Sequence, residues 1–182
     1  MVSRTAIILG ASGSVGQALL AEVTSCGGFS RILVMTRRPL KLQLGPQAEE
    51  RLVPEMEPDK LFQAVVDALR ELGGEVVGFS VLGVGAGTAK LSLDAHRAVD
   101  VELNAAFARG LKASGKVQHL AFMSSIGADV NAKTTGSGAA GMPRYLRVKG
   151  ESEAVAVALH PPTQSAIYNY PEMMSLRRTR ST

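Results

Sequence analysis

The sequence has few of the features that mark secreted, membrane-spanning or metal-binding proteins. Cys26 is the only cysteine, so no internal disulfide can form, and we expect a reducing, cytoplasmic setting. No apolar run approaches the ~20 residues that a membrane-spanning helix needs. The chain also enters an apolar strand at once, so no signal or transit segment is expected. The three histidines, His96, His119 and His160, have no ligand spacing, and we expect no metal site.

Aromatic residues are also scarce, at 4% of the chain, and tryptophan is absent. The formal net charge of +4 raises the question of nucleic acid, so the position of the charge matters. Arg177, Arg178 and Arg180 lie near the C-terminus, and without them 17 basic and 16 acidic residues remain. No stretch rich in lysine or arginine is interleaved with stacking side chains. We therefore expect no nucleic-acid partner.

Apolar runs alternate with segments of helical spacing along a chain of 182 residues, a length that fits one domain. The runs at 5–9, 31–36, 51–53, 75–82, 117–123 and 165–168 predict strands, and the segments at 15–23, 59–72, 94–114 and 145–159 predict helices. Such alternation predicts an α/β fold, a three-layer, doubly wound parallel sheet. We expect this domain to cover residues 1–170, followed by a disordered basic tail at 171–182. In the helix at 94–114, Ala98, Val101, Ala105 and Ala108 predict the buried face.

The beginning of the chain is the most informative stretch, because an apolar strand leads into a glycine turn and then into a helix. Glycine lets the backbone turn tightly and approach a ligand, and the start of a helix offers free N–H groups to a phosphate. The spacing is GxxGxxG, whereas the dinucleotide fingerprint of long-chain dehydrogenases is GxGxxG. The alternative is an ordinary turn that binds nothing. We expect a pyrophosphate to be held by the following residues: Gly10, Ser12, Gly13, Ser14, Val15 and Gly16.

Glycine-rich or polar stretches follow four of the expected strands, at 10–16, 36–38, 83–88 and 124–127. Ligands of such sheets bind beyond the carboxyl ends of the strands, so these stretches should meet at one crevice. Leu82 and Gly83 are expected to contact the cofactor there. The glycines at 83–88 are not followed by the Gly-Lys-Ser/Thr of a P-loop, which argues against nucleoside triphosphate hydrolysis.

Two arginines indicate which dinucleotide fits the crevice. A carboxylate at the end of the second strand is typical of NAD sites, and an arginine there accommodates the 2′-phosphate of NADP. The second strand ends in Thr36-Arg37-Arg38, and the next acidic residue along the chain is Glu49. Because a guanidinium binds a phosphate in a bidentate manner, we expect NADPH rather than NADH. The alternative is that Arg37 and Arg38 only face solvent.

Tyr145 and Lys149 are four residues apart, so they share one face of the last expected helix. A phenol is a poor acid at neutral pH unless a nearby cation stabilises its phenolate, and Lys149 is placed to do so. Ser124 or Ser125, after the fifth strand, could hold a carbonyl oxygen. The three side chains would then donate a proton to oxygen while hydride reaches carbon. A tyrosine–lysine pair at this spacing is also common on helix surfaces.

The stretches LGASGSVGQALL, VMTRRPL, FMSSIGAD and YLRVKGESEA together resemble the atypical or extended short-chain dehydrogenases/reductases. Within that family they are most similar to the Tat-interacting oxidoreductase-like NADPH-binding proteins, over residues 4–160. The resemblance implies a Rossmann fold, a nicotinamide cofactor and an oxidoreductase acting on a small carbonyl or alcohol. It also implies a catalytic triad of Ser125, Tyr145 and Lys149.

Three departures from the family pattern favour a second hypothesis. Asp100 occupies the register of an asparagine that serves a proton relay in many relatives, with Asn104 one turn later. The loop at 131–143 is long and rich in glycine, and the family's substrate-covering segments do not follow residues 168–174. The alternative is therefore a catalytically weak or inactive NADPH-binding protein that presents a surface to a protein partner, or that forms a homodimer.

Overall fold

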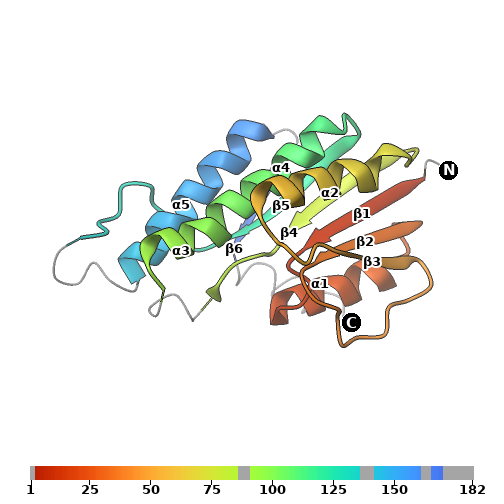
Figure 1. The fold of residues 1–182 in the computed structure, drawn as a ribbon, viewed down its shortest axis with the longest axis horizontal. Coiled ribbons are helices and arrows are strands. Elements are labelled where there is room, and N and C mark those ends of the chain that lie inside the picture. Colours follow the sequence, from red (N-terminus) through yellow and green to blue (C-terminus); the bar gives the residue numbers. More distant parts are fainter. Residues whose placement is uncertain (1–2, 86–90, 136–141, 161–164, 170–182) are drawn as a thin grey trace, which may run out of the picture.

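The computed structural model describes residues 3–85, 91–135, 142–160 and 165–169, which form a parallel sheet between helices (Figure 1). The strands are β1 (Arg4–Leu9), β2 (Arg31–Thr36), β3 (Ala48–Leu52), β4 (Glu75–Ser80), β5 (Val117–Ser124) and β6 (Ser165–Asn169). The helices are α1 (Ser14–Ser25), α2 (Pro58–Arg70), α3 (Leu93–Arg97), the π-helical segment η2 (Ala98–Leu103), α4 (Asn104–Ala113) and α5 (Met142–Leu159). The expected tail at 171–182 lies outside the described residues. No helix within the described ranges has the length and hydropathy that crossing a membrane requires.

The strand order is β3-β2-β1-β4-β5-β6, and every neighbouring pair is parallel. This order confirms the predicted doubly wound sheet and is that of the Rossmann fold. The chain leaves β1 toward β2 and later returns to β4 on the other side of β1. Leu9 pairs with Met35 of β2 and with Ser80 of β4, so the glycine turn starts at this switch point, where ligands of such sheets bind.

The central strand β1 is buried on both faces, which explains its continuous apolar run. Ile7 and Leu9 belong to the cluster under α2 and α4, and Ala6 and Ile8 belong to the cluster under α1. All four side chains are at most 1% exposed. In Figure 1, α1 lies on one side of the sheet, and α2, α4 and α5 lie together on the other. The carboxyl end of β1 is thereby held rigidly between two layers.

The structure divides the predicted helix at 94–114 into α3, η2 and α4 and corrects its buried face. Its buried residues include Asp100, Asn104 and Phe107 together with Ala108 of the predicted face, whereas the predicted Ala98, Val101 and Ala105 are only half-buried. Two polar residues therefore lie where the apolar spacing predicted none. A π-helical turn widens the helix and is frequent at functional sites, and here it contains Asp100.

The third strand is a second correction. The sequence predicts a loop at 39–50 and a strand at 51–53, whereas β3 runs over Ala48–Leu52 and pairs with β2. Its side chains are half-buried or exposed, as expected for an edge strand that is paired on one side only. The loop predicted at 131–143 is also shorter at its end, because α5 begins at Met142.

Candidate functional site

The glycine turn between β1 and α1 presents backbone rather than side chains. Gly10 has a φ of +94°, and a Cβ atom there would lie 2.6 Å from the backbone nitrogen of Leu82. A Cβ at Gly16 would collide with the carbonyl oxygen of Gly10. Both positions therefore require glycine, the first for its conformation and its contact with the loop after β4, and the second for the approach of α1 to the turn.

The N-terminus of α1 has no capping side chain, although Gly13 occupies the N-cap position and two serines flank it. Ser12, Gly13 and Ser14 are exposed, and a Cβ at Gly13 would meet only the carbonyl oxygen of Gly10, at 3.6 Å. The first turn contains no acidic residue. Its free N–H groups and the positive end of the helix dipole therefore suit an anion such as a pyrophosphate.

The loop after β4 connects the glycine turn to α5. Leu82 lies against Gly10, as described above, and Gly83 is the next residue. A Cβ at Gly83 would lie 3.0 Å from both Lys149 Nζ and Asp100 Oδ1. The structure thus brings together residues from three of the predicted cofactor-binding stretches, along the carboxyl edge of β1 and β4.

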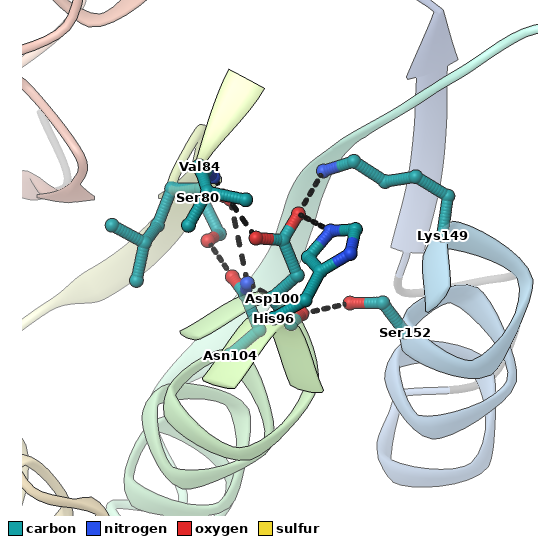
Figure 2. A network of polar contacts seen from close by, with 8 residues as sticks. Ser80, Val84, His96, Asp100, Asn104, Lys149 and Ser152 are labelled. Atoms are coloured by element: carbon teal, nitrogen blue, oxygen red, sulfur yellow. Dashed lines mark hydrogen bonds and ion pairs between the residues drawn. The ribbon is translucent and has the colours of Figure 1, made fainter. Parts of the chain in front are cut away.

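The buried ammonium of Lys149 is held by a carboxylate (Figure 2). Lys149 Nζ lies 2.9 Å from Asp100 Oδ1, and the two side chains are 3% and 0% exposed. The other carboxylate oxygen of Asp100 accepts a hydrogen bond of 2.9 Å from the backbone N–H of Val84. One carboxylate therefore joins α5 to the loop after β4. Tyr145 completes the predicted pair, with its ring centroid 5.8 Å from Lys149 Nζ.

Asn104 and Ser152 fix the backbone around Asp100, as Figure 2 shows. Asn104 Nδ2 donates to the carbonyl oxygen of Asp100 at 2.8 Å, and Ser152 Oγ of α5 donates to the same oxygen at 2.5 Å. Ser80, the last residue of β4, donates to Asn104 Oδ1. The asparagine that the family pattern leads one to expect at position 100 is thus replaced by a charged residue, and Asn104 supports it one turn later.

His96 is a buried member of this cluster that no sequence pattern marked as functional. It is 0% exposed, and neither ring nitrogen has a hydrogen-bond partner among the described residues. Burial lowers the pKa of His96 despite the opposing charge of Asp100, whose Oδ1 lies 3.8 Å from Nε2. The imidazole is therefore neutral near pH 7. Its ring lies nearly parallel to that of Tyr145, at 17° and 6.1 Å between centroids.

A second charged group holds α5 against α3. Arg97 donates two hydrogen bonds to Glu151, of 2.8 and 2.6 Å, and Arg147 donates a third, of 2.7 Å. The bond from Arg97 is the largest cause of the lowered pKa of Glu151. The carboxylate therefore stays ionised and keeps the helix of Tyr145 and Lys149 in place.

The two candidate serines differ in accessibility. Ser124, at the end of β5, is 3% exposed, and its hydroxyl has no hydrogen-bond partner among the described residues. Ser125 is half-buried, and its hydroxyl donates a long hydrogen bond of 3.4 Å to the carbonyl oxygen of Ile126. Ser125 is therefore the more accessible of the two.

A carboxylate from β3 lies against the arginine turn after β2, although it is distant from the turn along the sequence. Arg37 and Arg38 are exposed. Glu50 of β3 reaches the same turn, where it accepts hydrogen bonds from Thr36 Oγ1 at 2.7 Å and from the backbone N–H of Leu40 at 2.8 Å. It is distant along the chain but adjacent in space, because β3 pairs with β2. The arginines are therefore not the only charged groups at this end of the crevice.

Comparison with known proteins finds relatives both in sequence and in fold. The chain is 31% identical to protein HTATIP2 of Rattus norvegicus over 154 residues, which are 85% of this chain and 57% of that protein. It therefore spans little more than half of that relative's length. No protein-family model matches the chain.

Two solved structures illustrate the fold. A short-chain dehydrogenase from Burkholderia cenocepacia J2315 in complex with NADP is similar over 92% of this chain and 71% of its own, with a TM-score of 0.66 and 16% identity. MoeE5 in complex with UDP-glucose and NAD is similar over 98% of this chain and 60% of its own, with a TM-score of 0.63 and 17% identity. The chain has the Rossmann fold of these two proteins, and its similarity to HTATIP2 confirms the resemblance to the atypical short-chain dehydrogenases/reductases that the motifs indicate.

Proposed function

We propose that the chain binds NADPH across the carboxyl edge of the sheet and reduces a small carbonyl compound. One observation carries the proposal: a series of close contacts runs from Gly10 through Leu82 and Gly83 to Lys149. The turn suited to a pyrophosphate and the helix of the tyrosine–lysine pair thus line one edge. The exposed lone Cys26 favours a reducing, cytoplasmic setting.

The residues of this edge fit a nicotinamide dinucleotide phosphate. The uncapped start of α1, with exposed Ser12 and Ser14, would hold the pyrophosphate through its N–H groups. Arg37 and Arg38 would bind the 2′-phosphate, since a guanidinium matches phosphate geometry. Val15 and Gly16 would complete the turn, and Leu82 and Gly83 would lie beneath the cofactor. When bound, NADPH supplies the hydride.

Three side chains would handle the substrate oxygen. Ser125 would orient the carbonyl by donating a hydrogen bond to its oxygen, and its accessibility favours it over the buried Ser124. Tyr145 would donate a proton to that oxygen. Lys149, with its ammonium 5.8 Å from the ring centroid, would stabilise the phenolate that remains. Such positioned proton transfer contributes about 10²–10⁴-fold to a rate.

A second candidate function is an NADPH-binding protein with little or no turnover, which presents a surface to a protein partner or to a second copy of the chain. The observation that favours it is the burial of Lys149 against Asp100. An ammonium held by a carboxylate is a weaker stabiliser of a phenolate than a free one, because the two charges partly cancel.

A thermal-shift titration followed by a turnover assay separates the two functions. NADPH at 100 times its dissociation constant should add ~2.7 kcal/mol of stability, which is roughly 5–10 °C in Tm for a chain of this size. A larger response to NADH would refute the argument from Arg37 and Arg38. NADPH oxidation with a panel of small carbonyls, abolished in Tyr145→Phe without loss of the thermal shift, supports the reductase. Thermal shift without oxidation of any carbonyl supports the second function.

A further inference from the structure

Glu50 ties the two ends of the arginine turn together. It lies in β3, opposite Val34 of β2 in the parallel register. One carboxylate oxygen, Oε1, accepts both hydrogen bonds, from the hydroxyl of Thr36 before the turn and from the backbone N–H of Leu40 after it. Residues 37–39 are thereby closed into a short loop between two anchored positions.

The two anchors are the places where this segment can be held. Thr36 is 5% exposed and ends β2, so its hydroxyl is a fixed point of the sheet. Pro39 has no N–H, which makes the amide of Leu40 the first backbone donor after the two arginines. Bonds to a charged acceptor are stronger than bonds to a neutral one, so a single oxygen restrains both ends.

The neighbouring carboxylate on β3, Glu49, pairs with other arginines and not with the arginine turn. Glu49 makes ion pairs with Arg31 at 2.6 Å and with Arg51 at 2.7 Å. Within the described part of the chain, no ion pair involves the guanidinium of Arg37 or Arg38. The strand thus neutralises one pair of arginines with Glu49 and leaves the other pair, on the turn that Glu50 anchors, open to a ligand.

We propose that Glu50 is a positioning residue for cofactor selection: through Thr36 and Leu40 it holds Arg37 and Arg38 where a phosphate monoester on the ribose of NADPH can meet both. This inference rests on the proposed function and extends it to a residue of β3. The hydrogen-bond acceptor at Oε1 provides the positioning, whereas the negative charge of Glu50 repels the phosphate. Removal of the acceptor and removal of the charge should therefore have opposite consequences.

Two substitutions separate the acceptor from the charge. Glu50→Gln keeps a side-chain oxygen that can accept both hydrogen bonds and removes the charge, whereas Glu50→Ala removes both. Glu49→Ala is the matched control, since it disturbs the same strand without touching the turn. Dissociation constants for NADPH and NADH, and for adenosine 2′,5′-bisphosphate and adenosine 5′-monophosphate, are measured by calorimetry for each variant and for the wild type.

We expect Glu50→Ala to weaken NADPH and the 2′,5′-bisphosphate about tenfold, the equivalent of one lost charge-assisted hydrogen bond, and to change NADH and the 5′-monophosphate less than about twofold. Glu50→Gln should keep or raise the preference for the 2′-phosphate, and Glu49→Ala should leave it unchanged. Equal weakening of both members of each pair by Glu50→Ala overturns the inference, as does a Glu50→Gln that behaves like Glu50→Ala.

Two further outcomes separate this inference from the proposed function. Should NADPH bind without any change of preference in the Glu50 variants, the inference fails and NADPH binding stands. A wild type that prefers NADH, and that loses this preference in both Glu50 variants, would show that Glu50 binds the ribose itself. That result would refute the inference and the proposed preference for NADPH. A direct check needs no cofactor: amide hydrogen exchange at Leu40 should accelerate in Glu50→Ala and not in Glu49→Ala, and an unchanged rate would overturn the anchoring.

Discussion

Removal of the Asp100 carboxylate tests the buried ion pair with Lys149. The two charges lie 2.9 Å apart with almost no solvent exposure, and Asp100 also accepts the N–H of Val84. Asp100→Ala would leave an ammonium buried without its counter-ion, a change that costs about 3–5 kcal/mol in comparable sites. We therefore expect the free energy of unfolding to fall by about that amount, and Tm to fall by roughly 6–20 °C.

Urea unfolding of a double-mutant cycle measures the coupling between the two charges. Asp100→Asn keeps an oxygen for the N–H of Val84 and removes only the charge, so it should cost less than Asp100→Ala. The double variant combines Asp100→Ala with Lys149→Met, so it contains no buried charge at this position. It should be more stable than the sum of the single effects predicts, by about 1–3 kcal/mol. If the stability losses of the two single variants add up to that of the double variant, the two charges are not coupled. A loss below about 1 kcal/mol in Asp100→Ala would likewise show that Lys149 is solvated. Either result would refute the buried ion pair.

Two further predictions concern the surroundings of this pair. Glu151→Gln removes the charge that Arg97 and Arg147 share; since these side chains are 21% to 33% exposed, urea unfolding should show a loss of only about 1 kcal/mol that shrinks at high salt. Burial lowers the pKa of His96 below the usual value for histidine, with Lys149 acting in the same direction. Below about pH 6.5 the unfolded chain therefore binds a proton that the folded chain excludes. Stability should be full above about pH 7 and decline as the pH falls below about 6.5, and His96→Phe should reduce that decline.

Each of these predictions has its own control. A loss in Glu151→Gln that does not respond to salt would mean that packing, rather than charge, accounts for the contribution of Glu151. His160 is also buried with a pKa lowered by burial, so His160→Phe is measured beside His96→Phe. An acid decline that persists unchanged in His96→Phe, and disappears in His160→Phe, would contradict the assignment to His96.

The elements that the sequence predicts well are those whose signals are local. The strands β1 and β2 follow from continuous apolar runs, and the glycine turn follows from glycine at positions such as Gly10, where the structure has a φ of +94°. Such runs arise because these strands are buried on both faces or in the centre of the sheet. The fold class could be predicted from them without any knowledge of long-range contacts.

The third strand shows what a local pattern cannot reveal. Its residues, Ala-Glu-Glu-Arg-Leu, have neither an apolar run nor a clean alternation, because the strand lies at the edge of the sheet and is partly exposed on both faces. Pairing with β2 alone defines it. The same long-range pairing brings Glu50 to the arginine turn, so the late start predicted for the strand and the missed carboxylate have one cause.

The buried cluster around Asp100 escaped the sequence for a related reason. A buried face is predicted from apolar spacing, so Ala98 and Val101 were favoured over Asp100 and Asn104, which the structure buries completely or nearly so. Polar residues can occupy a core position only if their partners are supplied from elsewhere in the fold. Here the partners come from α5 and from the loop after β4, more than a dozen residues away along the chain.

The two halves of the proposed cofactor site therefore depend on different physics. At the glycine turn, backbone N–H groups form the site, and what it needs from the sequence is the absence of side chains, as at Gly10 and Gly16. At the α5 end, Lys149 is oriented before any ligand arrives, because the fold already buries it against Asp100. Pre-orientation of this kind lowers the cost of ordering on binding, but it also makes the ammonium share its charge with a carboxylate. In the proposed reductase, Asp100 therefore determines how much of the ammonium's charge is left to stabilise the phenolate of Tyr145.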